Sequence, residues 1–133
     1  MVQLHEVSLP FYSDDNSVPP GGSLQKYQEN LLKAVRLAGV QDVTPQLEGY
    51  LLDAGFTDVR VVVKKLPLGP WAKDKKKKEL GMWGLAISEE GLRAYGLALF
   101  TRQLGLSPEE ATALCDGAFA ELSRRQVHTY VAQ

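Results

Sequence analysis

Five residues have side chains suited to acid–base chemistry: His5, Glu6, Asp14, His128 and Tyr130. His128 and Tyr130 lie two positions apart in a predicted strand, so their side chains share one face of it. They are the best-spaced polar pair in the chain for general acid–base catalysis. His5 and Glu6 are adjacent on another predicted strand and point to opposite faces. Alternatively, each histidine is only hydrogen-bonded, and Asp14 with Asp15 forms a turn.

Large apolar side chains near a Gly-Pro turn predict a pocket for a small apolar molecule. The residues expected to line it are Phe11, Tyr12, Trp71, Met82, Trp83 and Tyr95. Packing in the hydrophobic core is the alternative, and it is favoured for Trp83.

The motifs of several common sites are missing. Gly21 and Gly22 precede a helix, but they follow a proline-rich loop and belong to no phosphate-binding motif. The histidines lack the spacing of a metal-ligand pair on a helix, and no serine-nucleophile elbow occurs. Cys115 stands alone in an apolar helical pattern, which predicts a buried small hydrophobe. The sequence therefore gives no reason to expect a cofactor or a metal.

The overall charge argues against nucleic acid as a partner. Fifteen basic residues stand against sixteen acidic ones, for a net charge of -1, whereas nucleic-acid-binding domains are usually basic. The run Lys75–Lys78 could hold phosphate or a membrane surface, but a solvated helix start is favoured because no second basic cluster accompanies it. One cysteine, no signal peptide and no apolar stretch of ~20 residues predict a soluble, cytoplasmic protein without membrane contact.

Local signals predict helices and strands that could position these residues. Apolar spacing and capping residues predict helices over 23–39, 45–54, 76–104 and 108–124, the third of them broken near Ser88. The last helix has the strongest signal, because Ser107-Pro108-Glu109-Glu110 forms a capping box. Alternating or β-branched segments predict strands over 2–9, 56–64 and 126–132.

Four stretches resemble one known family. They are VQLHEVSLPFYSDD (2–15), the helix from Ser23, LLDAGFTDVRVVVKKLPLGPWAKDKKKKELG (51–81) and LSPEEATALCDGAFAELSRRQVHTYV (106–131). Together they resemble the back half of fungal class I methyltransferases of the LaeA-like type, which are common in secondary metabolism. AGFTDV and KLPLGPWAKDKKKKELG are the most specific of them.

The resemblance implies a remnant of the seven-stranded methyltransferase sheet. The three predicted strands would be its last three, and the final strand would insert antiparallel between the other two. The S-adenosylmethionine site of the family is built mainly upstream of a strand like Val2–Val7, so the chain is expected to be truncated and to bind no cofactor. We expect one α+β domain over 1–133, with about three strands in a small mixed sheet packed by four or five helices. Residues 66–124 would form a helical substrate cover.

Two functions remain open. The first is a cofactor-independent cyclisation or isomerisation of a small apolar metabolite, with the aromatic pocket folding the substrate and one of the five acid–base residues polarising it. The second is a non-catalytic subunit that completes or regulates a separate methyltransferase. The strand at 2–8 would have an exposed edge, which predicts a homodimer or a methyltransferase-like partner.

Overall fold

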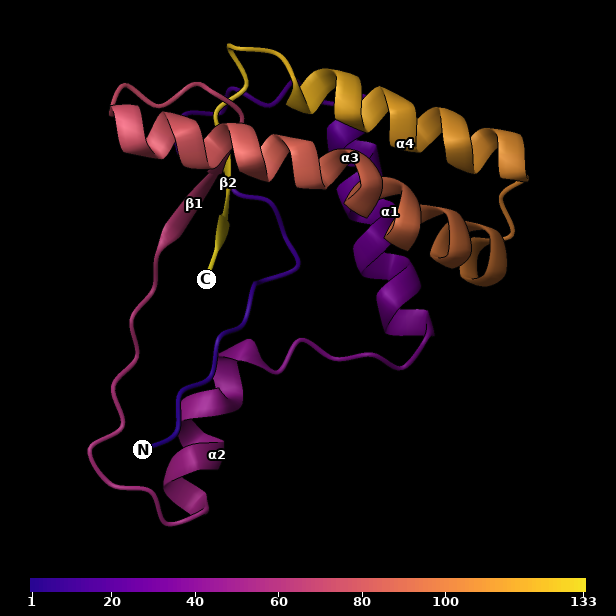
Figure 1. The fold of residues 1–133 in the computed structure, drawn as a ribbon. Coiled ribbons are helices and arrows are strands. Elements are labelled where there is room, and N and C mark those ends of the chain that lie inside the picture. Colours follow the sequence, from indigo (N-terminus) through magenta and orange to yellow (C-terminus); the bar gives the residue numbers. More distant parts are fainter.

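Three helices form a layer that packs against a short antiparallel sheet, and a fourth helix lies apart from them (Figure 1). The computed structural model describes residues 1–133. In chain order the elements are α1 (Ser23–Leu37), the 3-10 helix η1 (Thr44–Gln46), α2 (Leu47–Asp53), β1 (Lys65–Leu68), α3 (Lys75–Leu104), α4 (Pro108–Leu122) and β2 (Thr129–Ala132). The mixed helix-and-sheet architecture expected from the sequence is confirmed, with two strands in place of about three.

The first helix follows its apolar spacing. Leu24, Tyr27, Leu31 and Val35 are buried on one face of α1, which is the periodicity of an amphipathic helix. Gly39 follows the helix with a φ of 73°, a left-handed conformation that glycine adopts at little cost and that ends helices. The predicted helix over 23–39 is therefore confirmed.

Helix α3 is continuous, and the predicted break near Ser88 is wrong. The Ser88 hydroxyl donates to the Gly84 carbonyl at 2.8 Å, within its own helix, so it does not cap a new one. The Asp74 side chain caps the helix by accepting from the Lys77 N–H, and Gly105 ends it in a left-handed conformation. Lys75–Lys77 are exposed in the first turn, as expected, and Lys78 is half-buried.

The capping box before α4 is present as predicted. The Ser107 hydroxyl accepts from the Glu110 N–H at 3.1 Å, and the Glu110 carboxylate accepts from the Ser107 N–H at 2.8 Å. Pro108 occupies the first turn, where its missing N–H would have no helical partner. Helix 108–124 is confirmed to within two residues at its end.

Two of the predicted strands are wrong. Residues 2–9 form no strand, and the segment 57–64 is also irregular, with β1 starting only at Lys65. Their β-branched residues stay exposed, among them Val2, Val61, Val62 and Val63. Strand propensity expresses the fit of a side chain to a half-buried pleated surface, and here no neighbouring strand supplies that surface. The third prediction, 126–132, is confirmed in part as β2.

The strand order implied by the resemblance is retained in part, with β2 in the middle. β2 pairs antiparallel with β1, with Leu66 opposite Val131. On its other side β2 meets the segment 8–12: the Ser8 N–H donates to the Ala132 carbonyl, and Tyr12 and Tyr130 form an isolated antiparallel bridge. The last strand thus lies between β1 and the N-terminal segment, with α3 and α4 inserted before it (Figure 1).

The core lies where α1, α3 and α4 meet. The ring of Tyr27 packs edge to face against Phe100 at 5.2 Å between centroids, and its hydroxyl donates to the Leu92 carbonyl at 2.9 Å. Burial raises the pKa of the Tyr27 phenol. Cys115 is buried beside them, as predicted, and burial raises the pKa of its thiol. At Gly96 a Cβ would lie 2.6 Å from the Cys115 sulfur, so only glycine allows α3 and α4 this approach.

Helix α2 lies away from this core. Val43, Tyr50, Leu52 and Phe56 all expose large apolar side chains, and Figure 1 shows α2 beyond the lower ends of the sheet and of α1. Residues 40–64 therefore form an outlying segment. No helix of the chain is both long enough and apolar enough to cross a membrane.

Candidate functional site

The N-terminal loop 12–17 runs beside β2 and carries two carboxylates to it. The N–H of Tyr130 donates to the Tyr12 carbonyl at 3.0 Å, and the N–H of Tyr12 returns a bond of 2.9 Å to the Tyr130 carbonyl. Five residues along the loop, the Ser17 hydroxyl accepts from the N–H of His128 at 2.7 Å. These bonds fix both ends of the loop beside residues 128–130, so Asp14 lies against Tyr130 of β2 and Asp15 against His128 just before the strand.

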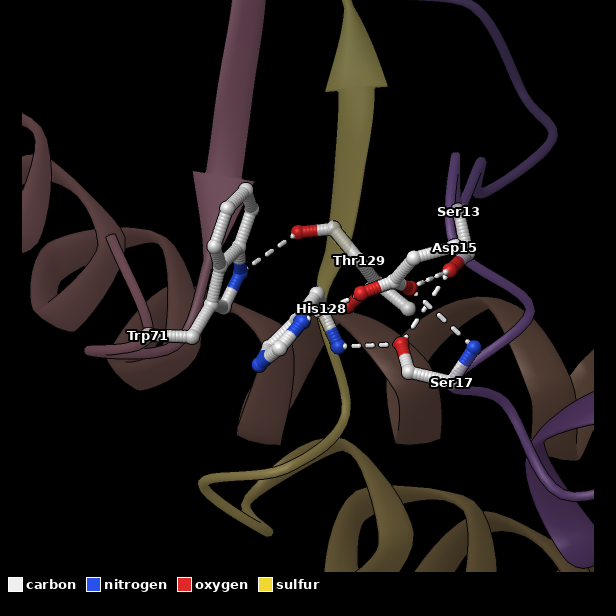
Figure 2. Close-up of polar contacts among 6 residues, drawn as sticks. All are labelled: Ser13, Asp15, Ser17, Trp71, His128 and Thr129. Atoms are coloured by element: carbon white, nitrogen blue, oxygen red, sulfur yellow. Dashed lines mark hydrogen bonds and ion pairs between the residues drawn. The ribbon is translucent and has the colours of Figure 1, made fainter. Parts of the chain in front are cut away.

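Asp15 and His128 form the central contact of this site (Figure 2). The imidazole Nδ1 lies 2.5 Å from the Asp15 Oδ2, and the side chains are 50% and 39% exposed for Asp15 and His128. The hydrogen bond from His128, followed by one from Ser17, holds the pKa of the Asp15 carboxyl well below its usual range. A carboxylate on one ring nitrogen fixes the tautomer and orientation of a histidine, and it leaves the other nitrogen free to exchange protons.

Trp71 bounds the imidazole on its other side. Its ring centroid lies 5.3 Å from that of His128 at an interplanar angle of 35°. The indole N–H donates to the Thr129 carbonyl at 3.0 Å, which fixes the ring beside β2. Figure 2 shows Trp71 reaching β2 from the chain after β1, opposite the loop that carries Asp15. His128 thus lies between an aromatic face and a carboxylate.

A second polar group extends the site along β2. Asp14 accepts from the Tyr130 hydroxyl at 2.7 Å and from the Lys65 ammonium at 2.6 Å. Lys65 also lies 4.6 Å above the centre of the Tyr130 ring, and the Tyr12 ring stacks on Tyr130 at 5.6 Å. The ion pair with Lys65, with help from Tyr130, lowers the pKa of Asp14 and raises that of Lys65.

We call these eight residues the β2 site. They are Tyr12, Asp14, Asp15, Ser17, Lys65, Trp71, His128 and Tyr130. Ser13 connects the site to a surface cavity of about 460 Å³, because its hydroxyl donates to Asp15 at 3.0 Å and it also lines that cavity. The remaining lining residues are Phe11, Asn16, Val18, Pro20, Leu24, Gln25 and Gln28.

The structure brings together three of the five predicted acid–base residues. Asp14, His128 and Tyr130 belong to the β2 site, whereas His5 and Glu6 lie on the exposed irregular segment before Val7. The sequence favoured Asp15, together with Asp14, as a turn former, with contact to a ligand as the alternative. Nothing in the spacing of the chain connects it with a histidine more than a hundred residues later, so its role emerges only from the fold.

The six residues predicted to line one apolar pocket are dispersed. Tyr12 and Trp71 are in the β2 site, and Phe11 packs near Tyr27 and lines the surface cavity. The other three project outward from α3 as exposed side chains: Met82, Trp83 and Tyr95. A shared aromatic pocket is therefore not formed within this chain, and the core packing favoured for Trp83 is wrong as well.

The residues do not fit S-adenosylmethionine, the cofactor of the family that the sequence resembles. Gly21 and Gly22 lie in the turn directly before the N-terminus of α1. There the Glu121 carboxylate accepts from the Leu24 N–H at 2.9 Å. A Cβ at Gly22 would lie 2.6 Å from the same carboxylate. No group of three or more His, Cys, Asp or Glu side chains is placed to hold a metal ion.

Comparison with known proteins gives consistent matches over nearly the whole chain. The methyltransferase pytC of Aspergillus terreus is 32% identical over 128 residues, which is 96% of this chain and 40% of that protein. The secondary metabolism regulator laeA of Fusarium oxysporum f. sp. lycopersici is 33% identical over 119 residues, 88% of this chain and 38% of that protein. The regulator LAE1 of Gibberella fujikuroi is 31% identical over the same shares.

This chain spans about two fifths of the length of the curated relatives it matches. No family model matches it, and no solved structure does.

Proposed function

Because this chain is a homologue of the fungal LaeA-like methyltransferases of secondary metabolism, we propose that it acts on a small apolar metabolite by proton transfer at the β2 site. The reaction class is isomerisation or cyclisation without a cofactor. His128 is the general base, and Asp15 is the residue that positions it. The site residues would suffice for such a reaction, because a proton that leaves one substrate atom returns to another and nothing else is consumed.

The contact between Asp15 and His128 carries this proposal. With Asp15 on Nδ1, the proton on that nitrogen stays in place and Nε2 presents its lone pair. When Nε2 takes up a proton, the imidazolium that forms is stabilised by the carboxylate 2.5 Å away. General bases arranged in this way contribute typically ~10²–10⁴ in rate. An exposed fraction of 39% for His128 leaves a small molecule room to approach.

The surroundings of His128 suit an apolar, delocalised substrate. Trp71 on one side and the Tyr12–Tyr130 stack along the strand offer aromatic faces. Lys65, held by Asp14, is a fixed positive charge on the same strand pair. It can stabilise an oxyanion that develops when His128 removes a proton from a neighbouring carbon.

A test uses nitrobenzisoxazole, an apolar aromatic probe that opens when a base removes its ring C–H proton. The N–O bond breaks as the proton leaves, and the product is a coloured cyanophenolate. The chain is expected to open it faster than free imidazole at the same concentration, and His128→Gln should lose that excess. His5→Gln is the matched control, since His5 is exposed and there are two histidines in the chain.

The role of His128 as the base would be contradicted if both histidine variants lost the same amount of ring-opening rate. It would also be contradicted if the wild-type chain were no faster than free imidazole. Asp15→Asn separates positioning from catalysis. It should lower kcat and shift the pH profile of the reaction while circular dichroism stays unchanged.

The second candidate function is a subunit that completes a methyltransferase sheet. The unpaired apolar segments favour it: Val2, Leu4 and Val7 are exposed, as are Val61, Val62 and Val63. In this proposal both segments become strands when a methyltransferase-type polypeptide pairs with them. The partner to test is a polypeptide of the relatives' sequence outside the matched two fifths.

Hydrogen exchange tests this subunit role. Mixing with that polypeptide should slow amide exchange over 2–7 and 57–64 and leave α4 unchanged, and the mixture should bind S-adenosylhomocysteine in a calorimetric titration. Unchanged exchange in both segments would exclude the subunit role and leave the proton-transfer proposal untouched.

A further inference from the structure

Two glutamine side chains of α1 hold the two ends of the loop 11–21. The Gln28 Oε1 accepts from the Phe11 N–H at 2.7 Å, and the Gln25 Oε1 accepts from the Gly21 N–H at 2.7 Å. Gln25 and Gln28 are three residues apart, so they lie on the same face of the helix. The surface cavity of about 460 Å³ is lined by this helix face and by the loop, and it therefore lies between them.

The same loop is also bonded on its other side, to the residues around β2. The Ser17 hydroxyl accepts from the His128 N–H at 2.7 Å, and Tyr12 exchanges two backbone hydrogen bonds with Tyr130. Bonds on both sides restrain the loop from collapsing onto α1 and filling the space. The cavity is therefore pre-formed, and its volume lies within the ~300–1,000 Å³ typical of small-molecule sites.

The walls of the cavity are apolar and uncharged. Four of its eight lining residues are Phe11, Val18, Pro20 and Leu24, and the other four have only neutral polar side chains. A charged ligand would lose hydration here and gain no counter-ion, which costs free energy. The ring of Phe11 offers an aromatic face to a flat molecule. The lining thus suits a neutral, largely apolar ligand.

Gln28 supplies one directional polar contact. A backbone N–H can only donate, so the atom that meets Phe11 is the oxygen of the Gln28 amide, and this fixes the amide orientation. The Gln28 Nε2 has no acceptor within the chain, whereas the Gln25 Nε2 donates to Glu29 at 2.9 Å. Gln28 is half-buried. Its unused N–H groups, beside apolar walls, select a ligand with a hydrogen-bond acceptor such as a carbonyl oxygen.

We propose that the cavity between the loop 11–21 and α1 binds a neutral aromatic carbonyl compound, whose carbonyl oxygen accepts from the Gln28 Nε2. The cavity is separate from the centre of the β2 site, because Asp15, Trp71 and His128 do not line it. This inference is therefore independent of the proton-transfer proposal.

Three related aromatic compounds test the chemistry of the ligand. The first is 7-methoxycoumarin, a neutral fluorescent lactone, into which the full chain is titrated. A Kd of about 0.1 mM is expected for a molecule of this size. The second, 7-methoxycoumarin-3-carboxylate, is ionised at neutral pH and should bind about tenfold more weakly or less well still. The third, 2-methoxynaphthalene, has no carbonyl group and should also lose about tenfold.

The key variant is Gln28→Glu. It keeps an acceptor for the Phe11 N–H and removes the donor, so it should weaken 7-methoxycoumarin by about tenfold or more. It should not weaken 2-methoxynaphthalene by the same factor, because that compound makes no bond to the donor. Gln103→Glu is the matched control, since Gln103 is exposed on α3 and the charge change is the same. Circular dichroism compares the folds of the two variants.

The place of binding is checked by nuclear magnetic resonance. The amide signals of Phe11 and Val18 and the side-chain NH₂ of Gln28 should shift on addition of 7-methoxycoumarin. His128→Gln should bind as wild type does, which keeps a failure of the proton-transfer proposal distinct from a failure here. Four results would each overturn the inference. They are no saturable binding at up to about 1 mM chain, equal binding of the ionised compound, unchanged affinity of Gln28→Glu, and signal shifts centred on the exposed Trp83 instead of the cavity.

Discussion

The carboxylate of Glu121 in α4 caps α1, accepting a hydrogen bond of 2.9 Å from the N–H of Leu24. Gly22 precedes α1 and has no side chain to cap it, so the cap comes from a residue 97 positions after Leu24. Glu121 is buried, with 8% exposed. A carboxylate at the N-terminus of a helix is also favoured by the helix dipole. One side chain thus caps α1 and binds it to α4.

Removal of this cap should destabilise the whole helical layer. Glu121→Ala leaves the Leu24 N–H buried and unpaired, and the expected loss is about 1–3 kcal/mol of unfolding free energy. Glu121→Gln keeps an acceptor and should lose less. Urea denaturation measures both. Glu79→Ala, at an exposed position of α3, is the control and should change stability little; an equal loss there would refute the cap.

Close approach of β1 to α3 depends on Gly81. A Cβ at this position would lie 2.1 Å from the Gly69 carbonyl oxygen, and the Gly69 N–H already donates to the Gly81 carbonyl at 2.9 Å. Gly81→Ala must therefore push the strand from the helix, and the expected cost is about 1–3 kcal/mol.

The control for Gly81→Ala is Gly49→Ala. That glycine is open and helical, so alanine there should stabilise by up to ~1 kcal/mol. Thermal unfolding distinguishes the two variants, and a Tm that moves the same way in both would contradict the close contact.

Acid should weaken the attachment of the loop 12–17 to β2. The pKa of Asp15 is depressed in the folded chain, chiefly by His128. A depressed carboxyl pKa stabilises the fold above the unfolded value of ~3.9. The stabilisation is lost as the pH falls through the lower folded value. The difference in stability between wild type and Asp15→Asn should therefore shrink as the pH falls below about 4.

Asp53→Asn serves as the control for this titration, because Asp53 makes no side-chain hydrogen bond or ion pair. Its difference from wild type should not follow the same curve. A gap between wild type and Asp15→Asn that grows as the pH falls below about 4 would have the wrong sign for a stabilised carboxylate.

In the monomer, amides of the unpaired segments should exchange rapidly. Residues 2–7 and 57–63 form no ladder and are largely exposed, so their protection should be near that of an unfolded chain. Tyr27 and Phe100 lie in the core, and the amides around them should exchange only on global unfolding. Protection of 57–63 in the isolated chain would show that the segment forms a strand within one copy.

Local signals in the sequence predicted the helices because a capping residue or a terminating glycine acts on residues within a few positions of itself. Ser107 and Glu110 lie three residues apart and satisfy each other, and Gly39 ends α1 through its own φ. The strands required distant partners instead. Val61–Val63 have the side chains of a strand, but this chain provides no adjacent strand for them, and propensity alone does not create one.

The site was predictable to a similar extent. His128 and Tyr130 were found from their spacing, which is a property of one strand. Asp15 and Ser17 joined them only through the crossing of the N-terminal loop, and Lys65 through the pairing of β1 with β2. Periodicity also failed to decide the orientation of α3: with apolar residues on both faces, the sequence did not indicate that Trp83 and Tyr95 would point outward.

The rate at which the buried Cys115 thiol is labelled would report how often α3 and α4 separate. It is the sole cysteine of the sequence, and it contacts the α3 backbone through a hydrogen bond of 3.4 Å to the Leu92 carbonyl. A thiol reagent can reach it only when α3 and α4 separate. The labelling rate, followed without any engineered probe, therefore measures how often these two helices part, and a ligand that holds them together would slow it in proportion.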